Sequence, residues 1–258
     1  MAIMNDRIQV FDSNGDAYER SFQVFLQNTD QKKRARQWFE AFLKGVSKRQ
    51  LLIDAGAGSG EVTAWLSTWF QKTIAIEPNP FLLAKLHGLL PSAEVICKPI
   101  LEAVPSTKAD LVVCSHTFYY LKESSWLDHL ERLLSWMQPT GSTVIVVQHH
   151  ETDCMRMLEH FCGHRFNLSV LADMLKAQHG SRYKMQMVRN DAYIETEDFD
   201  SAFTIAEFML NLLPLTAPPA KTAVESYIRS HFVPVQNGYR FSCHQDFLQI
   251  WSSNLTAA

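Results

Sequence analysis

Between residues 51 and 147, short apolar runs alternate with longer stretches in which apolar positions recur at helical spacing. The short runs predict five buried strands, at 51–54, 73–76, 93–97, 110–115 and 143–147. The stretches between them predict amphipathic helices at 61–70, up to 90, and at 124–137. Because strand and helix alternate regularly, we expect a parallel sheet with crossover helices.

The regions on either side of this alternation are mostly helical in pattern. Helices are predicted at 17–27, 30–44, 153–162, 168–179, 201–213 and 221–232, and two late strands at 183–195 and 239–251. The predicted fold class is α/β: a Rossmann-like seven-stranded sheet with helices on both faces and a helical substrate lid. We expect a lid at 1–48, a core at 49–150, and late helices with the last two strands at 151–258.

Composition and charge exclude several classes of protein. The 258 residues are 47% hydrophobic, which is enough for one large domain with a modest lid. A net charge of −3 gives no basic footprint for nucleic acid. The five cysteines form no C-x-x-C pair, and the sequence contains neither a signal-peptide pattern nor a bilayer-length apolar run. We expect a cytoplasmic monomer or weak dimer without nucleic-acid or membrane partners.

A glycine-rich turn follows the first predicted strand. Asp54 ends that strand, and Gly56, Gly58 and Gly60 alternate before a helix that opens at Glu61. Glycine lacks a Cβ, so the backbone can turn sharply and a ligand can approach it closely. The free N–H groups of the helix start then face that ligand. The pattern therefore predicts a site for a nucleotide-type cofactor.

The residues around the glycines decide between cofactor classes. A dinucleotide fingerprint, G-x-G-x-x-G, needs a third glycine where this chain has Glu61, and no P-loop lysine follows. An NAD-dependent enzyme is therefore disfavoured. The second predicted strand is followed by Glu77, whose carboxylate can accept both hydroxyls of a ribose held over the glycine turn. The alternative is an apolar strand with a glycine-rich turn and a surface glutamate.

Acidic residues at two strand ends, around three alternating glycines, make the chain similar to the class I S-adenosylmethionine-dependent methyltransferases. The resemblance implies a Rossmann-like methyltransferase sheet, with S-adenosyl-L-methionine as the cofactor and a small-molecule methyl acceptor as the partner. The predicted cofactor-binding residues lie in the glycine turn or directly after a strand: Asp54, Gly56, Gly58, Gly60, Glu77, Pro78, Lys98 and Ser115.

The loop after the fourth predicted strand carries the candidate catalytic residues. Ligands of an open α/β sheet lie beyond the carboxyl ends of its strands, where this chain has His116, Tyr119 and Tyr120. His116 can hydrogen-bond or take a proton, and tyrosine rings can wall a flat substrate or face a cation. We predict that His116 and Tyr119 are catalytic. The alternative is that the tyrosines pack the loop onto the sheet and His116 is solvated.

A closer resemblance, thin but over nearly the whole chain, is to the histamine N-methyltransferases. The motifs in common are Tyr18-x-x-Ser21-Phe22-x-x-Phe25-Leu26, the glycine turn, Glu77-Pro78, Phe118-Tyr119-Tyr120-Leu121-Lys122, Leu215-Thr216-Ala217-Pro218-Pro219 and the run 241–251. The family implies a cofactor-binding core and a smaller substrate region built from the N-terminal helices and late inserts. It also implies an imidazole ring held in an aromatic pocket.

Cofactor positions match that family better than substrate positions do. His116 lies where the family has a substrate-contacting glutamine, and the family's glutamate falls near Asp30 or Gln31. Its C-terminal asparagine falls at Cys243, beside His244. A related flat nitrogen heterocycle therefore fits better than histamine. The predicted substrate-binding residues are Tyr18, Phe22, Gln31, His116, Tyr119, Tyr120, His149 and His244.

The run His149-His150-Glu151 raises the question of a metal site. Adjacent histidines in a strand or loop are expected to point apart, and no acidic partner stands at ligand spacing. We therefore predict that the protein binds no metal.

The function predicted from these residues is N-methylation of a small aromatic nitrogen heterocycle, imidazole-like or a natural-product intermediate. Transfer would be in line from S-adenosylmethionine. Such a nitrogen already offers a lone pair, so alignment at near-attack distance would supply most of the catalysis. Two alternatives stay open. One is an O-methyltransferase in which His116 is an obligatory base, and the other is a catalytically silent cofactor-binding protein of the same fold.

Overall fold

The computed structural model describes residues 6–12, 15–163 and 165–253, and they fall into two compact units. The first unit takes its described residues from 1–37, 148–166 and 190–245. The second takes them from 38–147, 167–189 and 246–258. Each unit is therefore assembled from three separate segments of the chain. Among the described residues, no helix is both long enough and apolar enough to cross a membrane.

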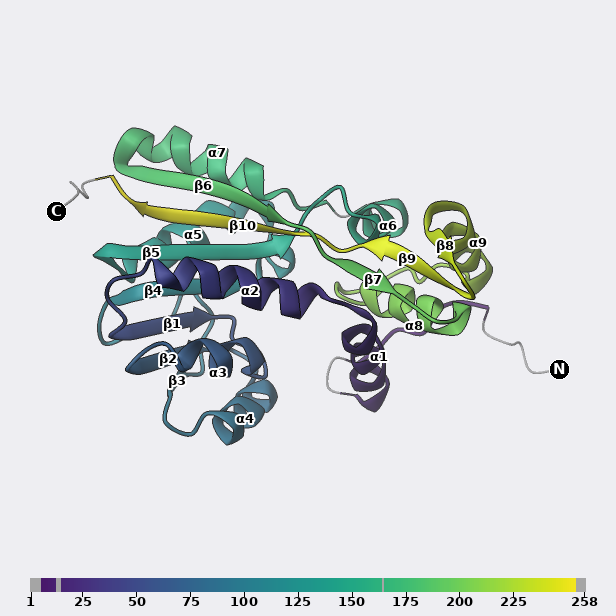
Figure 1. The fold of residues 1–258 in the computed structure, drawn as a ribbon, viewed down its shortest axis with the longest axis horizontal. Coiled ribbons are helices and arrows are strands. Elements are labelled where there is room, and N and C mark those ends of the chain that lie inside the picture. The colour runs from purple at the N-terminus through teal and green to yellow at the C-terminus, as the bar shows by residue number, and fades with distance from the viewer. Residues whose placement is uncertain (1–5, 13–14, 164, 254–258) are drawn as a thin grey trace. The chain divides into compact units, whose positions relative to one another are not determined.

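The second unit contains a seven-stranded sheet in the order β3-β2-β1-β4-β5-β10-β6 (Figure 1). Its strands are β1 (Leu51–Ala55), β2 (Lys72–Ile76), β3 (Glu94–Ile96), β4 (Ala109–Ser115), β5 (Met137–Gln148), β6 (Tyr183–Asn190) and β10 (Gln245–Ser252). The first five run parallel to one another, so their carboxyl ends meet at one edge. The sheet confirms the predicted α/β, Rossmann-like fold.

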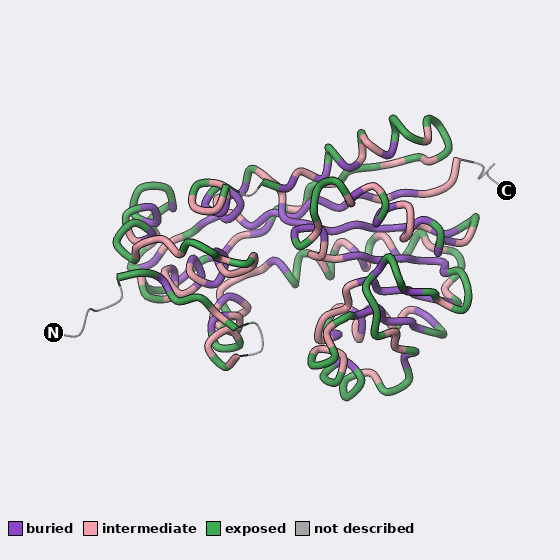
Figure 2. Tube along the Cα trace, turned by 180° about the vertical axis from the view of Figure 1, so that it is seen from behind, coloured by how far each residue is buried: buried purple, intermediate pink, exposed green. Residues whose placement is uncertain are grey.

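Helices and short helical turns connect these strands. They are α3 (Glu61–Ser67), α4 (Pro80–Leu89), η1 (Phe118–Tyr120), η2 (Glu123–Ser125), α5 (Trp126–Ser135), α7 (Leu168–His179) and η3 (Gly180–Arg182). The helix α2 (Gln31–Lys44) precedes β1, and only its residues from 38 on belong to this unit. The central strands β1, β2 and β4 are buried over nearly their whole length, and Figure 2 draws the middle of this sheet largely as buried. All five residues of β1 are buried, because a parallel strand is covered on both faces.

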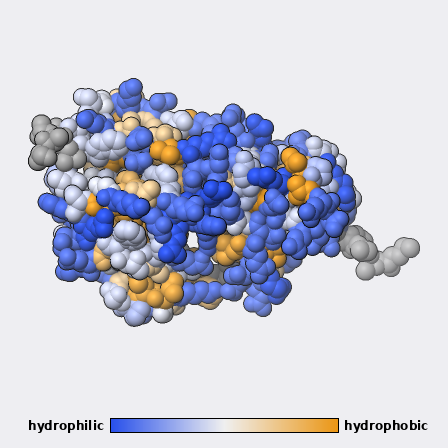
Figure 3. Space-filling view, in the orientation of Figure 1, coloured by the Kyte–Doolittle hydropathy of each residue, from blue (hydrophilic) through white to orange (hydrophobic). Residues whose placement is uncertain are grey.

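The α4 helix differs from the other connecting helices. Phe81 and Leu89 on it are 46% and 51% exposed, and only Leu86 is buried. Figure 3 shows apolar atoms gathered over this helix. Leu86 packs against the glycine turn, since a Cβ built on Gly60 would lie 2.8 Å from its Cγ.

The β5 strand is longer than the predicted 143–147. The run Pro139-Thr140-Gly141, whose residue types are typical of a turn, lies inside it, opposite a register shift between Ala109 and Leu111. β5 approaches β4 closely at this point, and only glycine fits at position 141, because a Cβ there would lie 2.8 Å from the carbonyl oxygen of Ala109. The turn residues therefore form an irregularity in the ladder and do not end the strand.

The first unit contains four helices and a small antiparallel sheet among its described residues. The helices are α1 (Asp16–Asn28), α6 (Asp153–Cys162), α8 (Phe199–Leu210) and α9 (Lys221–His231). The sheet has the order β7-β9-β8, with β7 (Tyr193–Glu195), β8 (Val233–Val235) and β9 (Gly238–Ser242). This sheet is not predicted from the sequence.

The predicted strands 183–195 and 239–251 are each divided between the two sheets. The first divides into β6 and β7, and the second into β9 and β10. The breaks are bonded to each other: the Cys243 N–H donates to the Ala192 carbonyl at 3.0 Å, and the Ala192 N–H donates to Nδ1 of His244 at 3.0 Å. These bonds satisfy the backbone where each chain segment leaves one sheet for the other.

Candidate active site

The glycine turn at the end of β1 has the backbone conformation that its sequence predicts. Gly56, Gly58 and Gly60 have φ angles of 77°, 57° and 88°, in the left-handed region that favours glycine. The Gly56 N–H donates to the Ile76 carbonyl at 2.8 Å, which ties the turn to β2. A Cβ on Gly56 would lie 2.2 Å from Oγ1 of Thr117, so the β4 loop also requires glycine here.

The Glu77 carboxylate is fixed beside this turn. Its side chain is 6% exposed, and its two oxygens accept N–H bonds from Gly58 and Asn79, both at 2.9 Å. A carboxylate oxygen has a second lone pair, so each can still accept a hydroxyl. A Cβ on Gly58 would meet nothing within 4 Å, which leaves open space against the acid. A fixed carboxylate beside an open glycine fits a ribose-bearing cofactor.

Asp54 is the second acid of the site. It is 2% exposed and accepts a hydrogen bond from Oγ1 of Thr63 at 2.6 Å. Burial raises the pKa of Asp54 from 3.8 to about 6; the Thr63 bond lowers it, and the nearby charge of Glu77 raises it. The site thus concentrates two buried acids at the carboxyl edge of the sheet, where a cationic ligand would be favoured.

His116 follows directly on β4 and has an unusual backbone. Its φ is 55°, a left-handed conformation that is costly for a residue with a Cβ, and its N–H donates to the Val146 carbonyl at 2.7 Å. The Nδ1 atom lies 3.1 Å from the Tyr119 hydroxyl. Tyr119 is 7% exposed and Tyr120 is 56% exposed, so the two tyrosines have different surroundings. The Tyr119 hydroxyl is therefore placed to orient the His116 ring.

The remaining predicted cofactor residues lie on loops of the same unit. Ser115 is the last residue of β4, and its carbonyl accepts the Thr117 hydroxyl at 3.2 Å. Pro78 follows Glu77 and is exposed. Lys98 is also exposed, and its N–H donates to the Ile96 carbonyl at 3.0 Å. Because Pro78 and Lys98 are both exposed, a ligand can reach their side chains.

Five predicted substrate residues lie in the first unit, and two of them share an aromatic cluster. The Tyr18 and Phe22 rings of α1 pack on Phe208 of α8 with centroids 5.3 Å and 5.5 Å apart. Burial raises the pKa of the Tyr18 hydroxyl. Packing on Phe208 is sufficient to explain why aromatic residues occupy positions 18 and 22. The role of Tyr18 and Phe22 toward a substrate stays a prediction.

Gln31 and His244 are held by backbone groups of the same unit. The Gln31 amide donates to the Cys243 carbonyl at 2.9 Å, and Gln31 is 6% exposed. His244 is also 6% exposed and accepts the Ala192 N–H at Nδ1, so its neutral ring carries the proton on Nε2. Asp30, the neighbouring candidate, accepts the Tyr193 N–H at 2.8 Å. These bonds anchor the N-terminal helices to the small sheet.

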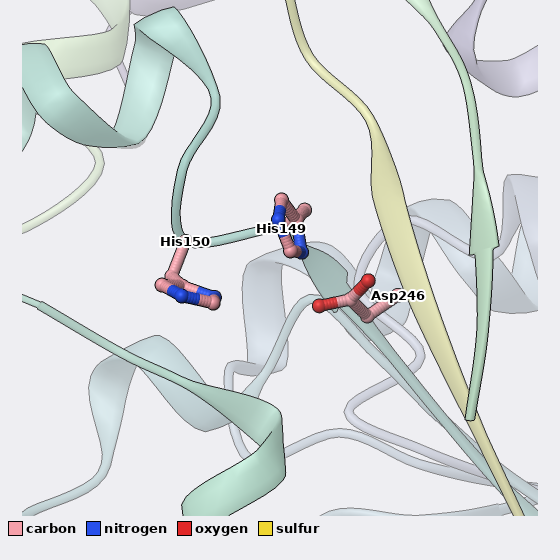
Figure 4. A group of neighbouring side chains, drawn as sticks. All are labelled: His149, His150 and Asp246. Carbon is pink, nitrogen blue, oxygen red and sulfur yellow. The ribbon is translucent and has the colours of Figure 1, made fainter. Parts of the chain in front are cut away.

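His149 and His150 do not point apart as the sequence predicts. Their ring centroids lie 4.6 Å apart, and Figure 4 draws the two rings near one another. The prediction assumed strand alternation, but β5 ends at Gln148 and a turn follows, in which the Thr152 N–H donates to the His149 carbonyl at 3.1 Å. Asp246, also drawn in Figure 4, is the second residue of β10 and belongs to the second unit.

Three residues of the site are missed by the sequence reasoning. Thr63 donates to Asp54, Thr117 closes on Gly56, and Asn79 donates to Glu77 and caps α4 by accepting the Phe81 N–H at 2.9 Å. A signal was present only for Asn79, because Asn followed by Pro is a typical helix start. Thr63 and Thr117 contact residues that lie far along the chain or across the turn, so spacing alone does not identify them.

The seven-stranded sheet is that of a Rossmann-like α/β protein, with the buried acid Glu77 beside a glycine-rich turn. The methyltransferase domain family matches residues 25–205, and the chain belongs to that family. No curated protein matches the sequence.

Solved structures of similar fold include methyltransferases. The YcgJ protein of Bacillus subtilis has a TM-score of 0.60 at 13% identity, over 82% of this chain and 96% of its own. The N-methyltransferase NodS of Bradyrhizobium japonicum, in complex with S-adenosyl-L-homocysteine, has a TM-score of 0.56 at 12% identity, over 93% and 100%. DhpI in complex with the same product has a TM-score of 0.53 at 11% identity, over 92% and 94%. At these identities the similarity is one of fold.

Proposed function

We propose that the protein is an S-adenosylmethionine-dependent N-methyltransferase that acts on a small aromatic nitrogen heterocycle, imidazole-like or a natural-product intermediate. The observation that carries the proposal is the contact between His116 and Tyr119. His116 has a left-handed backbone and lies at the carboxyl edge of the sheet, beside the glycine turn. Strained backbone of this kind persists where the surroundings enforce it, and it is typical of functional sites. The resemblance of motifs to the histamine N-methyltransferases supports the heterocycle.

The residues around the glycine turn bind the methyl donor. Glu77 accepts the ribose hydroxyls, and its two oxygens are already oriented by the Gly58 and Asn79 N–H groups. Asp54 supplies a buried negative charge for the cationic donor, and Pro78, Lys98 and Ser115 line the site from neighbouring loops. When bound, S-adenosylmethionine supplies a methyl group on a positively charged sulfur, which is open to in-line displacement by a nucleophile.

The acceptor is aligned by the loop after β4. His116 hydrogen-bonds the acceptor ring or takes its proton after transfer, and Tyr119 holds the imidazole in one orientation through the 3.1 Å contact at Nδ1. An acceptor nitrogen with a lone pair needs no strong base, so most of the rate enhancement comes from positioning. Tyr18, Phe22, Gln31, Tyr120, His149 and His244 complete our assignment of acceptor-contacting residues.

The proposal is tested by methyl transfer from an isotopically labelled donor to a panel of imidazoles, pyridines, phenols and catechols. We expect label on a ring nitrogen. His116→Ala should lower turnover roughly 10- to 100-fold, because alignment is lost, while donor affinity by calorimetry stays within about twofold. The matched control is His87→Ala, at an exposed histidine of α4, which should leave both quantities unchanged. Loss of donor binding in His116→Ala would contradict the role given to His116.

A second candidate is O-methylation of a small hydroxylated acceptor. The same histidine–tyrosine pair favours it, because an imidazole held in one orientation by the Tyr119 hydroxyl can take the proton of an acceptor hydroxyl. His116 would then be obligatory, turnover would fall steeply below the pKa of the base, and label would appear on oxygen. Donor binding without labelled product on any acceptor would instead favour a silent binding protein of the same fold.

A further inference from the structure

Thr63 is a buried residue that lies close to the glycine turn but outside the glycine motif. It lies in α3, directly after the glycine turn, and its side chain is fully buried. Its hydroxyl donates to Oδ2 of Asp54 at 2.6 Å, a short bond of the charge-assisted kind. The bond joins Asp54 of β1 to Thr63 of α3, and the three glycines of the turn lie between these two residues in the chain.

The surroundings of Asp54 otherwise disfavour its anion. Glu77 approaches from β2 with a like charge, and Cys114 of β4 has its thiol pKa raised to about 12 by burial, with the Asp54 charge adding to the rise. Cys114 is thus a neutral thiol. Burial itself is the largest effect and raises the pKa of Asp54, and of the groups that set this pKa only Thr63 favours the charged form.

We propose that Thr63 is a positioning residue for the methyl donor: its hydroxyl holds the Asp54 carboxylate in one orientation and as an anion, ready for the cationic donor. This inference rests on the proposed use of S-adenosylmethionine and extends it to a residue outside the glycine motif. The whole Thr63 side chain is buried, whereas its hydroxyl alone bonds Asp54, so a substitution can remove the hydroxyl and keep the buried volume.

The proposal predicts a particular pH dependence. If Thr63 keeps Asp54 ionised, removing its hydroxyl raises the pKa of Asp54 further, and more of the empty protein carries a protonated acid near neutrality. Donor binding must then release that proton, so apparent affinity falls at a pH where the unaltered protein still binds fully. At a pH well above both pKa values the difference disappears. A residue that only filled space would weaken binding equally at every pH.

The test is calorimetric titration of the full chain with S-adenosylmethionine and S-adenosylhomocysteine, from about pH 5.5 to about pH 8.5. Thr63→Val has the same shape without the hydroxyl, and Thr63→Ser restores the hydroxyl. We expect Thr63→Val to bind S-adenosylmethionine roughly tenfold more weakly near neutral pH, with the falling limb moved up by about one pH unit. Thr63→Ser should follow the unaltered profile, and both variants should keep the circular dichroism of the folded protein.

The outcomes separate this proposal from the proposed function. A Thr63→Val profile that equals the original, or that is lowered by the same factor at all pH values, overturns the role of Thr63 while leaving donor binding intact. A Thr63→Ser variant that behaves like Thr63→Val also overturns it, because the hydroxyl would not be the active part. Absence of saturable binding by the unaltered protein removes the use of S-adenosylmethionine and the Thr63 role together.

Discussion

Gly58 shows how a single residue can serve the ligand at some cost to the fold. Its backbone is left-handed, its N–H is donated to Glu77, and the space where a Cβ would lie is open. A side chain there would meet no protein atom but would enter the space beside the acid. Glycine is therefore favoured here by the backbone angle and not by packing, and under our proposal the open space beside Glu77 holds the methyl donor.

Gly58→Ala is expected to destabilise the fold by about 1–2 kcal/mol, the cost of a left-handed residue with a Cβ, and to weaken donor binding at least roughly tenfold. The matched control is Gly163→Ala, since Gly163 also has a positive φ of 64° and open space around its Cβ position, at the end of α6. Thermal unfolding should report similar losses for both, whereas calorimetry should find weaker donor binding for Gly58→Ala alone. Equal donor binding by the two variants would contradict the placement of the donor.

The residues of the donor site were predictable to the extent that they are local in sequence. Asp54, the three glycines and Glu77 stand directly at strand ends, where a parallel sheet collects ligands, so their pattern indicated the site. Thr63 and Thr117 were not predictable, because their partners are identified only by the distances of the folded chain. The ring positions of His149 and His150 were mispredicted because alternation ends with the strand.

At the level of elements, the sequence pattern identified the strands and helices better than it identified their partners. The helices α6 and α7 have the predicted bounds, and the first five strands lie where apolar runs were found. The late strands were identified as extended, but periodicity contains no mark for a strand that changes sheets. At the points where the strands change sheets, Ala192 is hydrogen-bonded to Cys243 and His244, which lie far from it along the chain.

The contact between β4 and β5 gives a prediction for one element pair. Gly141→Ala would place a Cβ 2.8 Å from the Ala109 carbonyl and 2.9 Å from that of Asp110, both of them backbone atoms that cannot move aside cheaply. We expect a loss of about 1–3 kcal/mol in the free energy of unfolding by denaturant. The control Gly88→Ala, in α4 with nothing within 4 Å, should be neutral or stabilising by up to about 1 kcal/mol. A neutral Gly141→Ala would show that the ladder relaxes around the added methyl.

For the molecule as a whole, the buried acid at the donor site costs stability at neutral pH. The folded-state pKa of Asp54, about 6, lies above its usual value of 3.8, so the folded protein binds the proton more tightly than the unfolded chain does. The contribution of Asp54 to stability is therefore most favourable below about pH 4 and is lost as the pH rises through about 6. A functional acid is retained against this cost.

Asp54→Asn removes that dependence and should stabilise the empty protein above about pH 7, by up to about 3 kcal/mol given 1.36 kcal/mol per unit of pKa difference. The gain should vanish below about pH 4, where both side chains are neutral. Chemical denaturation across this range, with the two proteins compared at each pH, measures the difference and cancels the titration of other groups. Donor affinity should fall in the same variant, so a variant that is both more stable and fully binding would contradict the role of Asp54.

The position of β10 in the sheet has a consequence for synthesis. It lies between β5 and β6, yet it is the last strand among the described residues, and the chain passes from one unit to the other after Gln245, the first residue of β10. On the ribosome, β6 lacks its neighbour until residues 245–252 have been synthesised, so its backbone groups stay unpaired on that side during this interval. The nascent chain is therefore exposed to aggregation and to chaperone binding between the synthesis of β6 and that of β10, and the arrival of β10 completes the sheet.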